Sequence, residues 1–194
     1  AGILPLRQAI VDYHQKYDGV TYAVNQVIVT EGAKNALFAL FQVILNPGDE
    51  VIVPAPYWVS YTEQIKLAGG VNVLVETAPE KGFNLEKHRT EKTVALLLNS
   101  PSNPTGMIYT PEELKAIGEW AVEHDVLIIA DEIYYRLTYN GNNAISIASL
   151  SEEIKNQTII INGISKTYAM TGWRIGYAIG NAEIISKMIE LSSH

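Results

Sequence analysis

Apolar residues recur along the chain in two alternating patterns. Short runs rich in branched apolar residues are typical of buried strands, and longer stretches with apolar residues three or four positions apart are typical of amphipathic helices. The first pattern predicts strands at residues 27–30, 51–53, 71–75, 94–98, 126–130, 158–161 and 176–179. The second pattern predicts helices over about 6–18, 34–45, 57–67, 111–124 and 182–191.

Turn-forming residues separate these elements. Glycine, proline and asparagine clusters end the helices, and Thr110 is expected to cap the helix that opens with Pro111. A polar connection is expected around residues 79–92. Strands that alternate with helices indicate an α/β fold of three layers, α/β/α, in which helices cover both faces of a mostly parallel sheet of about seven strands. The pattern shows one domain without internal repeats.

The composition narrows the possible partners and the location. A net charge of −7 argues against binding to nucleic acid or to an anionic membrane, since both require a basic surface. The chain has no cysteine, which excludes disulfides and thiolate metal sites, and its four histidines are too scattered to predict a metal centre. No apolar run is long enough to cross a bilayer and no signal peptide is evident, so a cytoplasmic location is expected.

One lysine lies where a ligand of such a sheet would bind. Ligands of open α/β sheets bind beyond the carboxyl ends of the strands, and Lys166 follows the predicted strand at residues 158–161. A primary amine at that position can form a Schiff base with a carbonyl compound. The alternative is a solvated surface lysine, and for Lys166 considered alone it is the better interpretation. Other segments of the chain favour the Schiff base.

Two segments suit a phosphate group. Residues 30–34 form a strand-to-helix turn in which Gly32 lets the backbone approach a ligand, and the helix N-terminus offers free amide donors. The spacing matches neither a Walker loop nor a dinucleotide fingerprint, so neither a nucleoside triphosphate nor NAD is indicated. Arg174, which lies beyond Lys166, can pair bidentately with a phosphate.

Polar residues also follow two other strands. Asp131 follows the strand at residues 126–130 and is expected to be partly buried and to need a cationic partner. A protonated ring nitrogen about 3 Å away would be attracted by about 5 kcal/mol at an effective dielectric near 20, enough to keep a pyridine protonated near neutrality. Tyr134 is expected to share this crevice, and the stiff loop 99–106 is expected to orient the amide of Asn103. The alternative role for Asp131 is a cap on the next element.

An amine, a carboxylate for a ring nitrogen and donors for a phosphate are together the groups that pyridoxal phosphate requires. Five segments carry them in order along the chain, namely T-E-G-A-K-N-A-L, P-A-P-Y-W-V-S-Y, N-S-P-S-N-P-T-G, A-D-E-I-Y and S-K-T-Y-A-M-T-G-W-R-I-G. With these segments the chain resembles the fold-type I pyridoxal-phosphate enzymes, and most closely the aspartate aminotransferase family of class I and II aminotransferases.

The resemblance implies a role for each matching residue. Lys166 would hold the cofactor as a Schiff base and then move the proton between the substrate Cα and the cofactor C4′. Asp131 would hold the pyridinium nitrogen, and Tyr134 and Asn103 would hydrogen-bond the 3′ oxygen of the ring. Trp58 would stack on the ring face, whereas Tyr57 and Tyr61 are expected to belong to the core. The phosphate would be bound by Arg174 and by the backbone amides of Gly32, Ala33 and Lys34.

The chain departs from the family pattern in two ways. The family commonly has serine or threonine three positions before the lysine, where this chain has Gly163, so weaker phosphate binding is expected. The resemblance covers only the large, cofactor-binding domain, which is assigned to residues 1–194. The chain resembles an excised segment in which the family's N-terminal arm and C-terminal small domain, with its substrate-carboxylate arginine, are expected to be absent. Family dimers share active sites, which implies a homodimer for the full-length parent.

The expected activity is transamination between an amino acid and a 2-oxo acid, with impaired substrate binding in this segment. Two alternatives remain open at this point. A carbon–sulfur lyase needs the same lysine and aspartate, and the sensor domain of a transcription regulator would bind pyridoxal phosphate without turnover. A scaffold without cofactor is disfavoured because Lys166 and Asp131 are both present.

Overall fold

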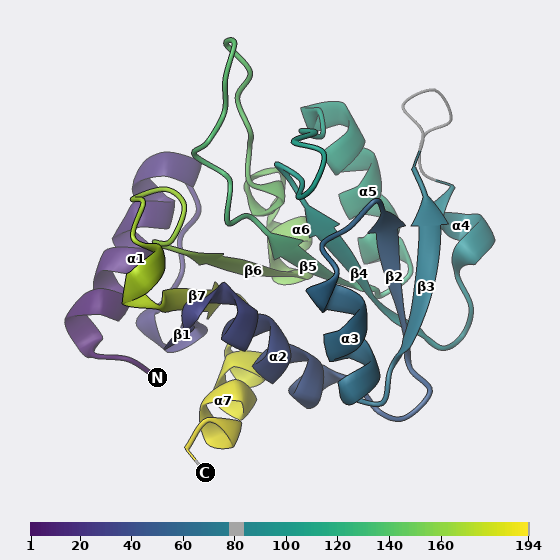
Figure 1. The fold of residues 1–194 in the computed structure, drawn as a ribbon, viewed down its shortest axis with the longest axis horizontal. Helices are drawn as coiled ribbons and strands as arrows, with labels where there is room; N and C mark the ends of the chain where they lie inside the picture. Colours follow the sequence, from purple (N-terminus) through teal and green to yellow (C-terminus); the bar gives the residue numbers. More distant parts are fainter. Residues whose placement is uncertain (78–83, 194) are drawn as a thin grey trace.

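The computed structural model describes residues 1–77 and 84–193 (Figure 1). Seven strands form one sheet in the order β1-β7-β6-β5-β4-β2-β3. The strands are β1 Val27–Glu31, β2 Glu50–Ala55, β3 Val71–Glu76, β4 Thr93–Asn99, β5 Leu127–Asp131, β6 Thr158–Gly163 and β7 Ile175–Ile179. All seven predicted strands are confirmed, within two residues at either end. Of the predicted polar connection, residues 79–83 lie outside the described residues.

Seven α-helices accompany the strands in the described part of the chain. They are α1 Leu4–Asp18, α2 Gly32–Ile44, α3 Ser60–Leu67, α4 Leu85–His88, α5 Pro111–Glu123, α6 Glu152–Asn156 and α7 Ala182–Leu191. The predicted cap of α5 is confirmed, since the Thr110 hydroxyl accepts from the Glu113 N–H and the Glu113 carboxylate accepts from the Thr110 N–H. The short helices α4 and α6 were not predicted because four or five residues do not display a helical period.

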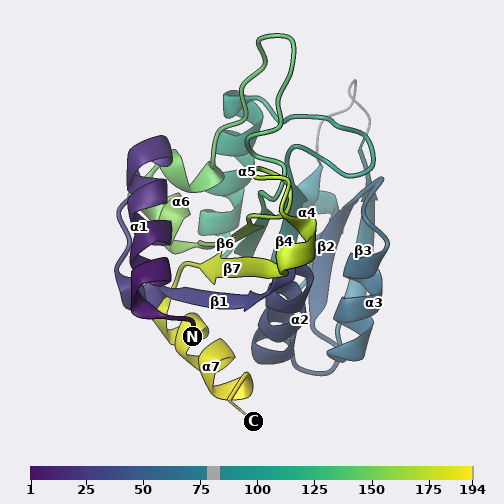
Figure 2. The same ribbon diagram turned by 60° about the vertical axis from the view of Figure 1, so that its left-hand side comes forward.

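The predicted three-layer arrangement is confirmed, with helices on both faces of the sheet (Figures 1 and 2). A separate apolar core lies on each face. Helices α1, α5 and α6 pack on one face, and α2, α3 and α7 pack on the other. Strand β4 shows how one strand serves both cores. Leu96 and Leu98 point into the first core and Ala95 and Leu97 into the second, as the alternation of side chains along a strand requires.

The sheet is mixed, and the exception to its parallel strands lies beside the predicted site. Strand β7 is antiparallel to both β1 and β6, whereas the other pairs are parallel. The carboxyl ends of β1, β6, β5 and β4 therefore lie at the same edge. The register aligns Asn99 with Asp131, Asp131 with Ile161, and Gly163 with Gly176. Segments separated by more than 100 residues in the chain thus meet at one edge of the sheet.

Candidate active site

A pocket of about 290 Å³, partly open to solvent, lies at this edge of the sheet. It brings together eight of the nine predicted site residues. Its lining residues are Ala33, Lys34, Trp58, Tyr61, Asn103, Asp131, Ile133, Tyr134, Ser165, Lys166, Thr171 and Arg174. The ninth predicted residue, Gly32, lies next to the pocket wall, because a Cβ atom built on it would overlap the guanidinium of Arg174.

Asp131 is the most deeply buried polar residue of the pocket, with 3% of its surface exposed. Its Oδ2 accepts a hydrogen bond of 2.6 Å from the hydroxyl of Tyr61, and its Oδ1 accepts one of 3.2 Å from the N–H of Ile133. Burial raises the pKa of Asp131 to about 6, although both hydrogen bonds lower it. Within residues 1–77 and 84–193, no lysine, arginine or histidine forms an ion pair with this carboxylate. A cation in the pocket would therefore be bound strongly.

Tyr61 was predicted to belong to the core, and the structure gives it a second role. Its ring is 2% exposed and packs in the core beneath α3, while its hydroxyl binds Asp131. Burial, together with the charge of Asp131, raises the pKa of Tyr61 well above its usual value, so the phenol stays protonated and remains a donor. Tyr61 follows Trp58 by three residues, and its N–H donates to the Trp58 carbonyl at 3.1 Å, so the two aromatic residues are held close together at the start of α3.

We expect Tyr61→Phe to destabilise the cofactor-free protein more at pH 7.5 than at pH 5. The folded pKa of Asp131, about 6, lies above the unfolded value, so its contribution to stability is present below about pH 4 and is lost as pH rises through 6. Removing the donor raises this pKa further. The lost hydrogen bond should cost about 1 kcal/mol when the carboxyl is neutral and about 2 kcal/mol when it is charged.

Urea unfolding at both pH values measures this difference. Tyr139→Phe is the matched control, because Tyr139 is 72% exposed, and it should leave stability unchanged at either pH. An equal cost for Tyr61→Phe at pH 5 and pH 7.5 would show that Tyr61 does not influence the charge of Asp131.

Lys166 lies in the turn that follows β6 and is half-buried. Its Nζ is 5.7 Å from the centre of the Tyr134 ring, so the amine and the phenol share one part of the pocket. The turn is held by hydrogen bonds from the Tyr168 N–H to the Ile164 carbonyl and from the Ala169 N–H to the Lys166 carbonyl, each 3.2 Å long. The backbone that carries the amine is therefore fixed, and the amine itself lines the pocket.

Trp58 stands at the pocket wall just before α3. Its indole meets the ring of Tyr61 edge to face, with centroids 5.4 Å apart. The Nζ of Lys34, from the first turn of α2, lies 4.9 Å from the centre of the indole ring. An aromatic face that is packed from below and half-buried can take a planar ring from above.

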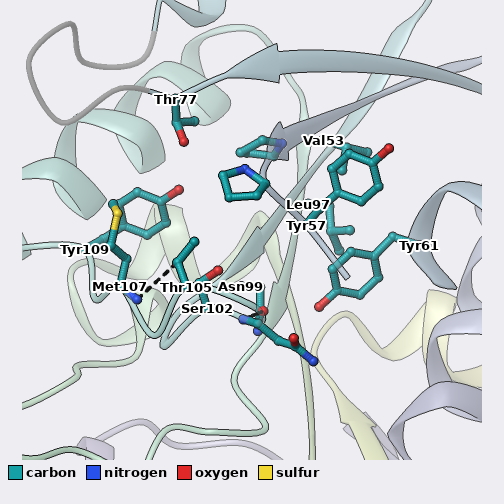
Figure 3. Close-up of a pocket in the computed structure, with 13 residues that line it drawn as sticks. Val53, Tyr57, Tyr61, Thr77, Leu97, Asn99, Ser102, Thr105, Met107 and Tyr109 are labelled. Carbon is teal, nitrogen blue, oxygen red and sulfur yellow. Dashed lines mark hydrogen bonds between the residues drawn. The ribbon is translucent and has the colours of Figure 1, made fainter. Parts of the chain in front are cut away.

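Asn103 is positioned through a neighbouring asparagine at the end of β4. The Asn103 N–H donates to Asn99 Oδ1 at 2.7 Å, and Asn99 Nδ2 donates to the Asp131 carbonyl at 3.0 Å. The predicted stiff loop is thereby tied to β5. It also borders a second, smaller pocket, where Tyr57 and Tyr61 lie opposite Met107 and Tyr109 (Figure 3).

The turn between β1 and α2 forms a cradle with the backbone of β7. Gly32 has φ +78°, a conformation that favours glycine. A Cβ atom on Gly176 would overlap Ala33 N and Gly32 C, so the two backbones touch. Arg174, with φ +53°, donates from Nη1 to the Thr171 carbonyl at 3.0 Å and extends over Gly32. The N–H groups of a 13-residue helix and a guanidinium therefore face the same space, which suits a phosphate.

The polar groups of this pocket fit pyridoxal phosphate. The buried carboxylate lacks a cationic partner among the described residues, the helix N-terminus and Arg174 can take an anion, and a lysine lies in the same pocket. The family model for class I and II aminotransferases matches residues 1–194. The chain belongs to this family. Class I and II aminotransferases depend on pyridoxal phosphate, in agreement with the donor set.

Known aminotransferases match the chain along its whole length. The aspartate aminotransferase of Bacillus sp. (strain YM-2) is 54% identical over 198 residues, which cover 100% of this chain and 50% of that protein. The aspartate/prephenate aminotransferase of Thermus thermophilus is 48% identical, with the same coverage. The structure of the aspartate aminotransferase from Thermus thermophilus with maleate has a TM-score of 0.94 at 47% identity and covers 100% of this chain and 51% of that chain. The chain thus spans about half the length of the curated relatives it matches.

Gly163, where the sequence predicts a departure from the family pattern, is closely surrounded by backbone in this structure. A Cβ atom on Gly163 would lie 2.7 Å from the Ile175 carbonyl oxygen and 3.0 Å from Gly176 Cα, so this backbone arrangement leaves no room for a side chain. Ser165, which is 8% exposed and was not predicted, lines the pocket beside Lys166 instead. The weaker phosphate binding expected from Gly163 stays a prediction.

The described residues contain neither a cluster of metal ligands nor a membrane-spanning helix. Within residues 1–77 and 84–193, no group of three or more histidine, aspartate or glutamate side chains is placed to hold a metal ion. Over the same part of the chain, no helix has both the length and the apolar character needed to cross a membrane.

Proposed function

We propose that residues 1–194 form the cofactor-binding domain of an aminotransferase that exchanges an amino group between an amino acid and a 2-oxo acid. The observation that carries the proposal is the buried carboxylate of Asp131 in the same pocket as Lys166. A surface lysine would not require a desolvated carboxylate close by, whereas pyridoxal phosphate needs both groups. Relatives that are 54% and 48% identical, an aspartate and an aspartate/prephenate aminotransferase, support the choice of reaction.

The reacting groups in this proposal are Lys166, Asp131 and Tyr134. When bound, pyridoxal phosphate supplies an electron-withdrawing ring that stabilises negative charge at the substrate Cα. Lys166 Nζ would hold the cofactor, and its amine would move the proton at the substrate Cα. The carboxylate of Asp131 keeps the ring nitrogen protonated. Tyr134, on the same side of the pocket as Lys166, donates to the 3′ oxygen.

The remaining predicted residues would bind and orient the cofactor. Asn103 shares the 3′ oxygen with Tyr134, and the loop that carries it is tied to Asp131 through Asn99. The indole of Trp58 covers one face of the ring. The phosphate is bound by Arg174 and by the N–H groups of Gly32, Ala33 and Lys34.

The proposal extends to assembly and location. We propose that the full-length protein is a homodimer, as the resemblance implies, and that it is cytoplasmic, as the sequence composition predicts. Two aromatic side chains near Lys166 and Arg174 in the chain are well exposed, Tyr168 by 55% and Trp173 by 68%. Large exposed aromatic groups are enriched where a partner binds, which supports a second copy at this rim.

A spectral titration of the chain with pyridoxal phosphate tests the proposal. A visible absorption band should appear at one equivalent of cofactor, and borohydride reduction followed by mass analysis should place the label on Lys166. Lys166→Ala should abolish both. Lys115→Ala is the matched control, because the Lys115 side chain is 66% exposed, and it should behave as wild type. Label distributed over surface lysines would contradict the proposed site.

The type of reaction is tested separately on the loaded protein. Addition of L-aspartate should convert the bound cofactor to its amine form, and a 2-oxo acid should restore it. Release of thiol and ammonia from a sulfur-containing amino acid, without exchange of the amino group, would support a carbon–sulfur lyase instead. A stable visible band with no reaction at all would support a sensor domain.

A further inference from the structure

The turn that follows β5 has two faces with different surroundings. Asp131 and Tyr134 line the cofactor pocket. Tyr135, 9% exposed, points away from the pocket toward the C-terminal end of α1. The turn itself is closed by hydrogen bonds from the Tyr135 N–H to the Glu132 carbonyl at 2.9 Å and from the Leu137 N–H to the Tyr134 carbonyl at 2.8 Å. Because the turn is short and closed by these hydrogen bonds, a displacement of Tyr135 on one side would also displace Tyr134 on the other.

A buried hydrogen-bond chain connects this turn to α1 and to β7. The Tyr135 hydroxyl donates to Asp18 Oδ1 at 2.6 Å. Asp18 Oδ2 lies 2.7 Å from His14 Nδ1, and the two side chains are each only 1% exposed. His14 Nε2 lies 3.0 Å from the hydroxyl of Tyr177 in β7. Asp18 and His14 each have a partner on both sides, and the network ends at Tyr135 in the turn and at Tyr177 in β7. These hydrogen bonds hold the geometry of the network.

A second contact lies next to the first. The guanidinium carbon of Arg136 is 4.2 Å from the centre of the Tyr17 ring, which is close enough for a cation–π interaction. Tyr17 and Asp18 are consecutive residues of the last turn of α1, and Tyr135 and Arg136 are consecutive residues of the turn after β5. Two adjacent pairs thus join the end of the N-terminal helix to the back of the segment that carries Asp131 and Tyr134.

We propose that Tyr135 and Arg136 are positioning residues for the cofactor site, anchored on Asp18 and Tyr17 of α1. They do not face the pocket and take no part in the chemistry. By fixing the back of the turn they set the direction of the Tyr134 hydroxyl and of the Asp131 carboxylate on its front. This inference rests on the proposed function, because the direction of these two groups matters only if the pocket binds the cofactor.

The hydrogen bond between Tyr135 and Asp18 can hold the turn in place because it is buried. A hydrogen bond to a carboxylate that is shielded from water is stronger than an exposed one, and its loss leaves part of the carboxylate unsatisfied. The turn would then be free to shift. A displacement of about 1 Å in a binding group can change a rate or affinity up to a hundredfold, so an anchor outside the pocket can act on the site.

Tyr135→Phe tests the inference, with Tyr22→Phe as its matched control. Tyr22 is also buried, with 4% exposed, and its ring centre lies 5.9 Å from that of His14, but its hydroxyl has no hydrogen-bond partner among the described residues. The two variants lose the same atom from similar surroundings. Tyr135→Phe should bind pyridoxal phosphate about tenfold more weakly and shift the pH midpoint of the visible band of the bound cofactor, whereas Tyr22→Phe should change neither.

The pH midpoint separates positioning from a general loss of stability. It depends on the hydrogen bonds at the 3′ oxygen of the cofactor, which a merely structural role would not alter. Arg136→Met provides a second variant that should fold normally, because Arg136 is exposed, and it should shift the midpoint in the same direction by a smaller amount. Hydrogen exchange of the cofactor-free protein should show faster exchange at residues 132–137 in Tyr135→Phe than in Tyr22→Phe.

The outcomes distinguish this inference from the proposed function. If wild type shows no visible band, the proposed function fails and the positioning role fails with it. If wild type shows the band and Tyr135→Phe matches Tyr22→Phe in affinity, midpoint and exchange, only the positioning role is overturned. A shifted midpoint with normal folding in both Tyr135→Phe and Arg136→Met supports it.

Discussion

Replacement of Asp131 by asparagine is expected to lower the rate of amino-group transfer by about a thousandfold. A carboxylate about 3 Å from a protonated ring nitrogen attracts it by about 5 kcal/mol at an effective dielectric near 20. At about 1.4 kcal/mol for each factor of ten, this corresponds to nearly four orders of magnitude, and desolvation of Asp131 offsets part of it. The asparagine oxygen can still accept the hydrogen bond from Tyr61 and loses only the longer bond from the Ile133 N–H, so the fold should be retained.

The rate at which the bound cofactor changes its spectrum after addition of amino acid measures the effect. Asp125→Asn is the matched control, because Asp125 precedes the opposite end of β5 and its side chain contacts Gln157 at 3.2 Å, far along the strand from the pocket. Asp125 has φ +52°, which asparagine adopts readily. The control should keep the wild-type rate. If Asp131→Asn also retained the rate within tenfold, the assignment of the ring-nitrogen partner would be wrong.

Gly176→Ala is expected to destabilise the fold by about 3 kcal/mol or more, since an added methyl group here meets backbone rather than movable side chains. The new Cβ atom would overlap Ala33 N and Gly32 C and lie 2.8 Å from Gly32 O. Gly176 is also paired with Thr30 on one side and Gly163 on the other, so β7 cannot move aside without breaking both ladders. Binding of pyridoxal phosphate should weaken in parallel, because the displaced N–H groups are those proposed to bind its phosphate.

Urea unfolding compares this variant with Gly172→Ala. A Cβ atom on Gly172 would meet no heavy atom within 4 Å, so this control makes the same chemical change four residues away in open space. Its free energy of unfolding should stay within about 0.5 kcal/mol of wild type. Equal stability of the two variants would mean that β7 and the β1–α2 turn are not in contact in solution.

The sequence predicts the strands well because short branched apolar runs such as 158–161 are typical of strands that are buried on both faces of a sheet. It does not predict the antiparallel direction of β7 directly. The information was present in the connection, since residues 164–174 carry no helical pattern and a parallel strand requires a crossover of a dozen or more residues. Strand order depends on contacts between distant segments, which local patterns do not contain.

The site was predictable where a residue type follows a strand, as Asp131 and Lys166 do. Tyr61 was not assigned to the site because a tyrosine that packs like a core residue gives no sign that its hydroxyl binds a group 70 residues away. Tyr135 was missed for the same reason, since its partner Asp18 lies 117 residues earlier. Hydrogen bonds of this kind arise from the tertiary fold, and a local sequence pattern contains only one of the two partners.

Because the strand ends are aligned, the regular spacing of the strands sets the distances between the groups that bind the ligand. From Asn99 on β4 to Glu31 on β1 the order of strands spans four spacings, or roughly 19 Å at about 4.8 Å each. Different strands position these groups: β1 and β7 carry the phosphate cradle, β6 leads into the turn that holds Lys166, and β5 ends at Asp131. A molecule that reaches all of them must lie across the strands. The backbone hydrogen bonds between the strands, rather than any side chain, fix the distances between the groups that bind it.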